Sequence, residues 1–553
     1  MDQAAEHTIA RHRELMQEKR HFEGHFEQIR AFLLPLIGSF SGKETPGRQN
    51  RERILDSSGE SASSDLAAAL HGSLTNPFTK WFSIRAERNS LNDNERVALW
   101  LSQARNRMMN VFNSPRSGFA PVISEVYQEI VDFGTAGMYI ADRPGQRILF
   151  QSRPINELAI AENADGKIDT VHREFDMTAR QVVQKFGEAA GAGLAKEAER
   201  NGERKFRMLH AIYPNSERRS SDARDSANLP VASDYILMDH NQTLRKRGYH
   251  EMPMVVARWN KRSGESWGRG CGGRALADVK SLQEGMRLNF RVVEKSADPP
   301  LMVADDGVVG PVRTGASAIN YVRRDLLMGR WSPISGLQTG ADPMLQESFL
   351  DTIRQRIDQA YFRHLIQMSR DPRMTATQVL KLDEEALRVL GPFLGRLYVE
   401  LLGPIIERVF GIMLRAGALG EVPPELHDQD ITIEYVSPLA KAQRLSEVTA
   451  VSQLVEVMAP YISQDPSLMD NINSDQALRH VGDRLSLPPE ILRDPREVAK
   501  IRERRQQAQQ EAQQAETLER GAAAAQSAGQ ALDSGGLRQA LGLGSGGNER
   551  GAA

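Results

Sequence analysis

The sequence of 553 residues predicts a helix-rich α+β fold. Apolar residues recur at three- and four-residue spacing over several long stretches, which is typical of amphipathic helices. Between residues 150 and 262, short apolar β-like runs alternate with a helical stretch. The chain is too long for a single hydrophobic core, so we expect several domains.

The composition is that of a globular protein with balanced charge. Lys and Arg (70 residues) nearly cancel Asp and Glu (72 residues), which leaves a net charge of -2. Proteins that grip DNA by counterion release carry a basic excess, so tight DNA storage is disfavoured and transient contact through local patches stays open. The single cysteine, Cys271, excludes an internal disulfide and suits a reducing compartment. No apolar run of about 20 residues predicts a membrane span, and the charged N-terminus lacks a signal-peptide core.

Residues 267–307 form the stretch around which we expect the fold to be organised. A glycine cluster opens it, an amphipathic helix over 274–298 follows, and Pro299-Pro300 ends the helix. One helix face carries an apolar stripe, made of Leu276, Val279, Leu282, Met286, Phe290 and Val293. The opposite face carries a charged stripe, made of Lys280, Glu284, Arg287, Arg291 and Lys295.

The part before this stretch is predicted to be mixed. Helices are expected near residues 2–34, 61–74, 93–113, 119–133 and 178–187. An aromatic strand is expected after the turn at Asn76-Pro77, and further strands at residues 139–142, 148–150, 170–175, 208–213, 235–239 and 254–259. The polar segment 216–228 is expected to be a mobile loop. No catalytic constellation gathers in this part of the sequence.

After the Pro-Pro stop, residues 299–342 predict a small β-containing module with strands at 301–304 and 319–321. A second amphipathic helix over 343–367 then carries an apolar stripe of Leu345, Phe349, Ile353, Ile357, Tyr361, Leu365 and Met368. The two helices therefore flank the module. A turn at 368–375 contains Arg370 and Arg373 beside a helix-stopping proline.

The longest predicted helix spans 376–416 and begins with a capping-box pattern at Thr375 and Gln378. Pro392 and Pro404 each remove a backbone hydrogen bond inside it, so we expect kinks there and an end at Gly417. A strand at 431–436 and helices near 440–459 and 475–486 follow. The segment 491–525 favours helix but has almost no apolar stripe, so it needs solvent or other copies around it. Residues 526–553 are expected to be disordered.

The sequence contains one candidate cofactor motif, a glycine cluster, and no catalytic motif. Gly268, Gly270 and Gly273 match G-x-G-x-x-G, yet the cluster begins well past the preceding strand and no repeating βαβ unit surrounds it. We interpret Gly268, Gly270, Gly272 and Gly273 as a hinge rather than a nucleotide site. His21 and His25 are spaced for a shared metal, but a surface pair is the favoured interpretation. Asp305-Asp306 reads as a turn. We therefore predict no catalytic, cofactor or metal residues and no enzyme activity.

The order of these elements and several motifs resemble the portal, or head-to-tail connector, family of short-tailed bacteriophages. The segments that carry the resemblance are DSSGESASSDLAAALHGSLTNPFTKWF, WGRGCGGRALADVKSLQEGMR, SADPPLMVADDG, RMTATQV and SPLAKAQR. It covers roughly residues 5–490. The resemblance implies a dodecameric ring at one capsid vertex of the virion, assembled in the host cytoplasm.

The resemblance also implies a portal-protein fold with assigned parts. These are a wing (1–273), a first stem helix (274–298), a clip (299–342), a second stem helix (343–367), a channel loop (368–375), a kinked wing helix (376–416), a crown (417–490), a barrel helix (491–525) and a disordered tail (526–553). The implied partners are viral double-stranded DNA in packaging and ejection, the terminase large subunit, tail adaptor or nozzle proteins, and the major capsid and scaffolding proteins that join procapsid assembly. No membrane partner is implied.

Two groups of basic residues are the candidate DNA-channel residues. Arg370 and Arg373 fall in the loop that the resemblance places nearest the DNA, where they would touch phosphates without reading sequence. Lys280, Arg287, Arg291 and Lys295 would face the channel or a neighbouring subunit; a merely solvated helix face is the alternative. A structural scaffold or adaptor without a channel is the runner-up function. A dinucleotide-dependent enzyme is the third, weaker reading.

Overall fold

The structure is a computed structural model of the chain and comprises two compact units, Met1–Ser446 and Glu447–Ala553. The boundary between the units falls inside the segment 417–490 that the resemblance assigns to the crown. The structure describes residues 2–35, 37–40, 53–92, 94–143, 147–216, 218, 226–297, 301–303, 310–312, 321, 334–336, 343–364, 388–426, 431–435, 448, 450–454, 456–461, 474–484 and 495–533.

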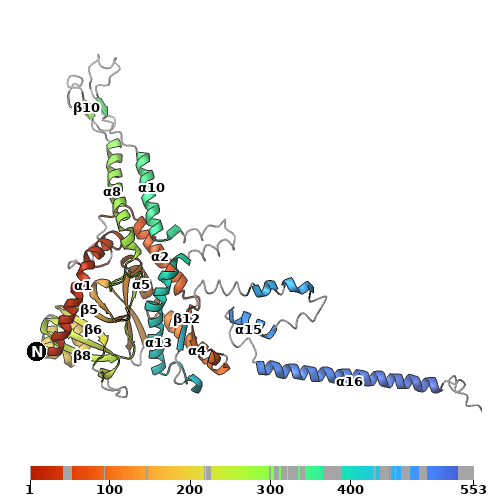
Figure 1. Cartoon of the computed structure of the whole chain (residues 1–553). Helices are drawn as coiled ribbons and strands as arrows, with labels where there is room; N and C mark the ends of the chain where they lie inside the picture. Colours follow the sequence, from red (N-terminus) through yellow and green to blue (C-terminus); the bar gives the residue numbers. More distant parts are fainter. Residues whose placement is uncertain are drawn as a thin grey trace, which may run out of the picture. The chain divides into compact units, whose positions relative to one another are not determined.

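The first unit combines helices with antiparallel sheets (Figure 1). Its main helices are α1 (Gln3–Leu33), α2 (Ser58–Leu74), α4 (Glu95–Asn113), α5 (Phe119–Phe133), α6 (Ala179–Phe186), α7 (Gly191–Arg200), α8 (Cys271–Ala297), α10 (Pro343–Ala360) and α13 (Gly403–Arg415). Its strands are β1 (Phe82–Ala86), β2 (Thr135–Arg143), β3 (Arg147–Arg153), β4 (Leu158–Glu162), β5 (Ile168–Thr178), β6 (Lys205–Pro214), β7 (Val231–Leu237), β8 (Gln242–Tyr249), β9 (Met254–Arg258), β10 (Leu301–Val303), β11 (Ile334–Gly336) and β12 (Ile431–Tyr435). The predicted helix-rich α+β class is confirmed.

Helix α1 covers one face of a five-stranded sheet with the order β4-β5-β6-β7-β8 (Figure 1). The Asp2 carboxylate caps the helix by accepting hydrogen bonds from the backbone N–H groups of Ala4 and Ala5. Ala5 and Ile9 then pack on apolar side chains of strands β6 and β7. The other face of this sheet carries α6 and α7 at one end, since their apolar side chains pack on Met208 and Leu237.

Helix α5 is the centre of the main core. Most of its side chains are buried, and Gly118 and Gly134 bound it at both ends with left-handed backbone conformations. It packs against α2, α8 and the three-stranded sheet β3-β2-β9. Strand β1 pairs antiparallel with β12, which joins residues 82–86 to residues 431–435 and so closes the first unit on itself.

Helices α8 and α10 lie side by side, and the short antiparallel pair β10–β11 lies in the chain between them (Figure 1). This arrangement confirms two flanking helices with a β-containing segment, and it confirms the strand predicted at 301–304. Tyr321, the described residue of the other strand candidate, is not in a strand. Strand β11 was not predicted because its three residues, Ile-Ser-Gly, carry no periodic signal.

Helix α10 differs from the helix predicted over 343–367 at two points. Phe349, predicted on the apolar stripe, is 62% exposed, whereas the neighbouring Leu350 is fully buried against α8. Helix α10 ends at Ala360, where Tyr361 and Phe362 form a turn and Phe362 adopts a φ of 56°. Residues 363–364 are helical again, and Leu365 and Met368 of the predicted stripe lie outside the described residues. At this turn the buried Tyr361 hydroxyl donates to Asp132, and the Phe362 ring contacts the Phe393 ring.

Of the long helix predicted over 376–416, residues 388–397 are helical and continue through the π-helical segment Tyr398–Leu402 into α13. Gly417 ends α13 with a φ of 68°, and the N–H groups of Gly417 and Ala418 bond to the carbonyls of Leu414 and Met413. The predicted end of this helix is therefore confirmed.

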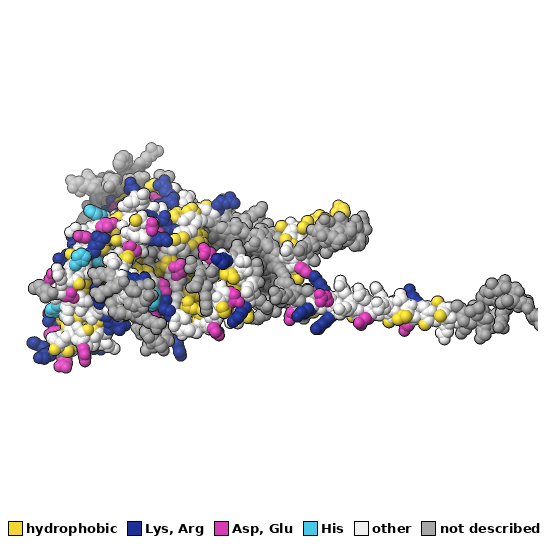
Figure 2. All heavy atoms as spheres, turned by 60° about the horizontal axis from the view of Figure 1, so that its bottom comes forward, with side chains coloured by type: hydrophobic (Ala, Val, Ile, Leu, Met, Phe, Trp, Pro, Cys, Tyr) yellow, Lys and Arg dark blue, Asp and Glu magenta, His cyan; other side chains and the backbone are white. Residues whose placement is uncertain are grey.

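The second unit contains α15 (Ser474–Arg484) and α16 (Pro495–Asp533). Helix α16 continues past the predicted end at 525, so residues 526–533 of the predicted tail are helical. Figure 2 shows α16 as a rod of mainly polar side chains with scattered blue and magenta charges, and Leu518 is 73% exposed. Along the described part of the chain, no helix is both long and apolar enough to cross a membrane.

Candidate functional site

The glycine cluster at the start of α8 packs directly on the end of α5. A Cβ atom on Gly270 would lie 2.5 Å from the carbonyl oxygens of both Val131 and Asp132, and one on Gly268 would overlap the carbonyl of Gly134. The glycines are needed because two backbone segments touch there without side chains between them.

Hydrogen bonds close this junction. The Gly268 N–H donates to Thr135 Oγ1 at 2.8 Å, and the Arg269 N–H donates to the Asn260 carbonyl at 2.8 Å. The faces of Gly268 and Gly270 on which a Cβ would lie are therefore covered by the backbone of residues 131–134. All strand pairs that the structure describes are antiparallel, so the βαβ context is missing as well. Bending at the four glycines stays a prediction.

The buried carboxylate of Asp132 connects helices α8 and α10 to this junction. Asp132 accepts hydrogen bonds from Ser63 Oγ at 2.5 Å, from Gln128 Nε2 at 3.1 Å and from Tyr361 Oη at 2.7 Å. Burial raises the pKa of Asp132 to about 6, although these three donors act in the opposite direction. Its backbone also contacts Gly272 at the first turn of α8. Asp132 therefore connects α2, α5, α8 and the end of α10.

The inner half of α8, residues 271–286, is embedded in the chain. Leu276, Val279 and Leu282 are buried, as the predicted apolar stripe requires. Gln283 accepts hydrogen bonds from the backbone N–H groups of Leu55 and Asp56 at 2.6 and 3.0 Å. The Asp56 carboxylate then accepts one from Arg354 of α10 at 3.0 Å, so one segment fastens the two helices together.

In the outer half of α8, residues 287–297, the described side chains, at 287–295, are exposed or half-buried within this single chain. Phe290 is 55% exposed and Val293 is 50% exposed, although both continue the stripe of buried residues. Arg287, Arg291 and Lys295 are exposed as well. Arg287 forms an ion pair with Glu284 at 2.7 Å, three residues earlier on the same helix face. The outer half thus exposes an apolar face and a basic face together.

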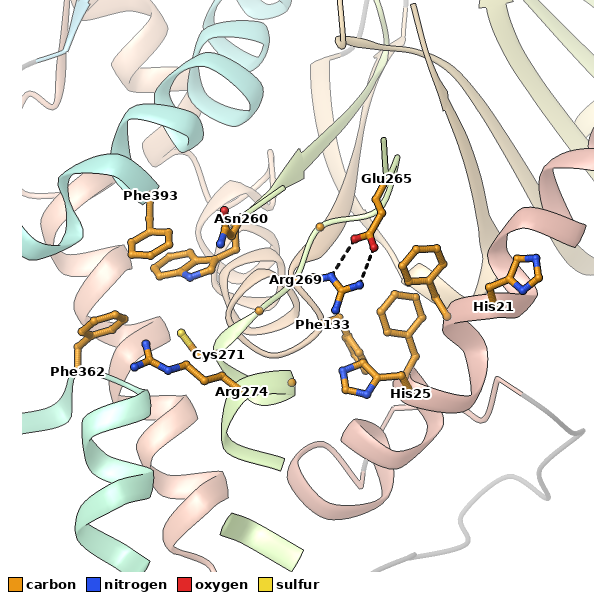
Figure 3. A pocket seen from close by; sticks show the side chains of 16 residues that line it. His21, His25, Phe133, Asn260, Glu265, Arg269, Cys271, Arg274, Phe362 and Phe393 are labelled. Atoms are coloured by element: carbon orange, nitrogen blue, oxygen red, sulfur yellow. Dashed lines mark hydrogen bonds and ion pairs between the residues drawn. The ribbon is translucent and has the colours of Figure 1, made fainter. Parts of the chain in front are cut away.

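A cavity of about 540 Å³ lies beside the start of α8 (Figure 3). Figure 3 shows Arg269 hydrogen-bonded to Glu265, with the His21 and His25 rings on separate turns of α1. No group of three metal-ligating side chains gathers anywhere in the described residues. The interpretation of His21 and His25 as a surface pair stays a prediction. The Cys271 thiol is buried, and burial raises its pKa to about 12, which disfavours the reactive thiolate form.

Comparison with known proteins shows to which family the chain belongs. The family model described as bacteriophage head to tail connecting protein matches residues 5–492. The chain belongs to this family. A probable portal protein of Bordetella phage BPP-1 is 29% identical over 533 residues, which are 94% of each chain. A portal protein of Salmonella phage epsilon15 is 29% identical over 503 residues, which are 89% of each chain.

Membership of this family shows the general role of the chain. The portal or head-to-tail connector family is structural and non-enzymatic, which confirms that the chain is not an enzyme. A head-to-tail connector belongs to the virion and has capsid and tail partners. The resemblance to phage portal proteins is confirmed over nearly the whole chain.

The other candidate residues lie in different surroundings. Arg370 and Arg373 lie outside the described residues, as does the capping box of Thr375 and Gln378. Lys280 of the basic stripe contacts a second helix, α1: its Nζ donates to Gln28 Oε1 at 2.6 Å and lies 5.8 Å from the Phe32 ring. Its side chain therefore helps to fasten α8 to α1.

The two helix-interrupting prolines also differ. Pro392 lies within the helical residues 388–397, whereas Pro404 is the second residue of α13, one residue after the π-helical segment. Because proline lacks a backbone N–H, the regular hydrogen-bond pattern of an α-helix is interrupted at each proline. A π-helical turn is one way to accommodate the missing hydrogen bond. The kinks themselves stay predictions.

Sequence reasoning missed the residues that hold this segment. Glu400, in the π-helical segment, accepts hydrogen bonds from Arg258 Nε at 2.9 Å and Nη2 at 2.8 Å. The Arg258 side chain is 1% exposed and also binds Glu162 of β4. Asp132 was missed for the same reason. A lone charged residue in a helix or strand gives no periodic signal for burial, and its partners lie far away in the sequence.

Proposed function

We propose that twelve copies of this chain form a closed ring at one capsid vertex and that viral DNA passes through it. The observation that carries the proposal is the change along α8: its apolar stripe is buried over the inner half and exposed over the outer half. A helix face of this kind needs a second surface to cover it. Membership of the connector family supports a neighbouring copy as that surface.

Exposed apolar side chains on both long helices support a shared interface. Phe290 and Val293 of α8 and Phe349 of α10 are each at least half exposed in the single chain. Burial of apolar area contributes about 25 cal/mol per Å², so a contact repeated around a ring stabilises the assembly strongly. Closed rings repeat one heterologous contact at every subunit boundary.

Electron microscopy tests the ring directly. Twelve chains of 61.6 kDa give roughly 740 kDa, and class averages should show closed twelve-fold symmetry. The variant Phe290→Ser/Val293→Ser should form fewer rings while each chain stays folded. A monomer or dimer at every concentration would contradict the proposal and favour a scaffold or adaptor without a channel.

The basic residues are proposed to contact the DNA backbone. Arg287, Arg291 and Lys295 are exposed, with Lys280 closer to the body of the chain, and Arg370 and Arg373 belong to the segment proposed as the channel loop. Because phosphate contacts do not depend on sequence, they suit a passage for DNA. Replacing Arg370 and Arg373 by alanine should change packaging or DNA retention and leave ring assembly intact. Unchanged packaging would count against the loop assignment.

The module at residues 299–342, with strands β10 and β11, is proposed to be the clip. It would dock the terminase large subunit during packaging and the tail adaptor proteins afterwards. The remaining parts are proposed as wing, crown and barrel helix, with capsid and scaffolding proteins as partners in procapsid assembly. Deleting residues 304–333 between the two strands should abolish adaptor docking to the ring. A deletion variant that still bound adaptor would refute this assignment.

A further inference from the structure

A row of side chains crosses one face of the five-stranded sheet. Arg173 of β5 lies opposite His210 of β6, His210 lies opposite Tyr235 of β7, and Tyr235 lies opposite Arg245 of β8. Directly opposed residues of antiparallel strands point to the same side of a sheet. The His210 and Tyr235 rings stack with centroids 3.9 Å apart, so the row is continuous.

Two further cations join this row from other elements. Lys185, in the last turn of α6, places Nζ 4.1 Å from the centroid of the Tyr235 ring. Arg153 of β3 lies 5.4 Å from the Tyr139 ring, which in turn meets His210 edge to face. We name Arg153, Arg173, Lys185 and Arg245 the sheet-face cation cluster.

The cluster is short of negative charge. Among the described residues, the carboxylate in an ion pair with it is Glu157, which binds Arg173 at 2.6 Å. The Nε of Arg153 is buried and has no hydrogen-bond partner. Burial and the neighbouring arginines lower the pKa of Lys185 to about 8 and that of Arg153 to about 10. Cations gathered in this way repel one another and lose hydration unless an anion joins them.

The surroundings indicate which anion fits. Arg173 is only 14% exposed and Arg153 is half-buried, whereas the Lys185 residue as a whole is exposed with its ammonium group folded over the Tyr235 ring. A phosphate of duplex DNA is held on a stiff, broad backbone and cannot reach side chains set behind others. A carboxylate on a slender side chain can, and its methylene groups can pack on the Tyr139, Tyr235 and Phe186 rings. We propose that the sheet-face cation cluster binds an acidic peptide segment of a partner protein.

Peptide binding to the full chain tests the proposal. Fluorescently labelled hexaglutamate is titrated against the protein and followed by anisotropy, with hexaglutamine as the neutral control. The variant Arg153→Met/Lys185→Met keeps the apolar stems and removes two charges, so the affinity for hexaglutamate should fall at least tenfold. Lys196→Met, an exposed lysine of α7 outside the cluster, should leave it unchanged. Circular dichroism verifies that each variant is folded.

Three results would overturn the proposal. The first is hexaglutamate binding that is absent, or is unchanged in Arg153→Met/Lys185→Met. The second is a labelled 20-base-pair DNA duplex that binds more tightly than the peptide and is lost in the same variant, which would assign the cluster to nucleic acid. The third is stabilisation by inorganic phosphate alone, which would indicate a small-anion site. None of these results depends on whether the chain forms a ring.

Discussion

The two halves of α8 have the same sequence pattern and opposite environments. In residues 271–286 the apolar stripe is buried against α1, α2, α5 and α10, and polar groups such as Gln283 find partners in the same chain. In residues 287–297 the stripe continues with Phe290 and Val293, both at least half exposed. Periodicity therefore reports which face of a helix is apolar. It does not report whether the covering surface belongs to the same chain.

The largest expected effect is that of a substitution at Gly268, just before the inner half of α8. Gly268→Ala places a methyl group against the Gly134 carbonyl and the Arg258 side chain, and the backbone at Gly134 has little room to move because it also accepts from the Trp259 N–H. We expect a loss of at least about 4 kcal/mol in the free energy of unfolding, or no soluble protein. Chemical denaturation followed by tryptophan fluorescence measures it.

Gly24→Ala is the control, because nothing lies within 4 Å of the added methyl group on α1. It should be neutral or stabilise the helix by about 0.5–1 kcal/mol. Similar losses in both glycine variants would mean that the close packing at Gly268 is not the cause.

The second prediction compares the two halves of the apolar stripe. Leu282→Ala removes a fully buried side chain and should reduce the free energy of unfolding by about 2–5 kcal/mol. Val293→Ala removes a half-exposed one and should cost under about 0.5 kcal/mol in the isolated chain. Light scattering should nevertheless show weaker ring formation for Val293→Ala. Equal destabilisation of the monomer by both variants would remove the distinction between the halves.

The third prediction uses the buried carboxyl that joins α5, α8 and α10. The pKa of Asp132 is about 6 in the folded chain, against an ordinary value of 3.8. Since the folded state binds this proton more tightly, its contribution is fully present below pH 3.8 and is lost as the pH rises through 6. The shift corresponds to at most about 3 kcal/mol. Asp132→Asn should remove that part of the pH dependence of unfolding between pH 4 and 6.

Tyr361→Phe is the matched control, because it deletes one hydrogen bond to Asp132 and keeps the carboxyl. It should move the pH window upward rather than abolish it, since a donor that favours the ionised form is gone. An unchanged unfolding profile for Asp132→Asn over this range would show that the carboxyl does not titrate there.

Much of the fold followed from the sequence because long helices repeat their pattern many times. Helices α1, α4, α5 and α8 were predicted to within a few residues. Strand β8 was missed because it is an edge strand whose Arg245, Lys246 and Arg247 break the apolar alternation. On α10, the buried residue is Leu350 and not Phe349 as predicted, and this error has another cause. Both are apolar neighbours, and the fit of Leu350 against Gly285 decides which one faces inward.

The candidate site was less predictable, since its polar contacts join distant parts of the chain. The glycine cluster was recognised, but the surface it packs against, residues 131–134, gives no signal in the sequence. Asp132 meets Ser63 and Tyr361 only because α5, α2 and α10 converge. The Arg258–Glu400 pair likewise links β9 to the π-helical segment. Such pairs follow from tertiary packing, and periodic patterns within one element do not contain them.

The smallest expected effect concerns the charged face of the outer half. The hydrogen bond from Arg287 lowers the pKa of Glu284, and both side chains are 53% exposed. Because water screens such a pair and holding two flexible side chains has an entropic cost, Arg287→Ala should leave the unfolding midpoint of the monomer unchanged. If this face serves DNA, the same variant should lower packaging efficiency in assembled particles while Glu284→Gln does not. A clear shift of the unfolding midpoint in Arg287→Ala would instead assign the outer half a role in folding, and the contrast along α8 would then lose its basis.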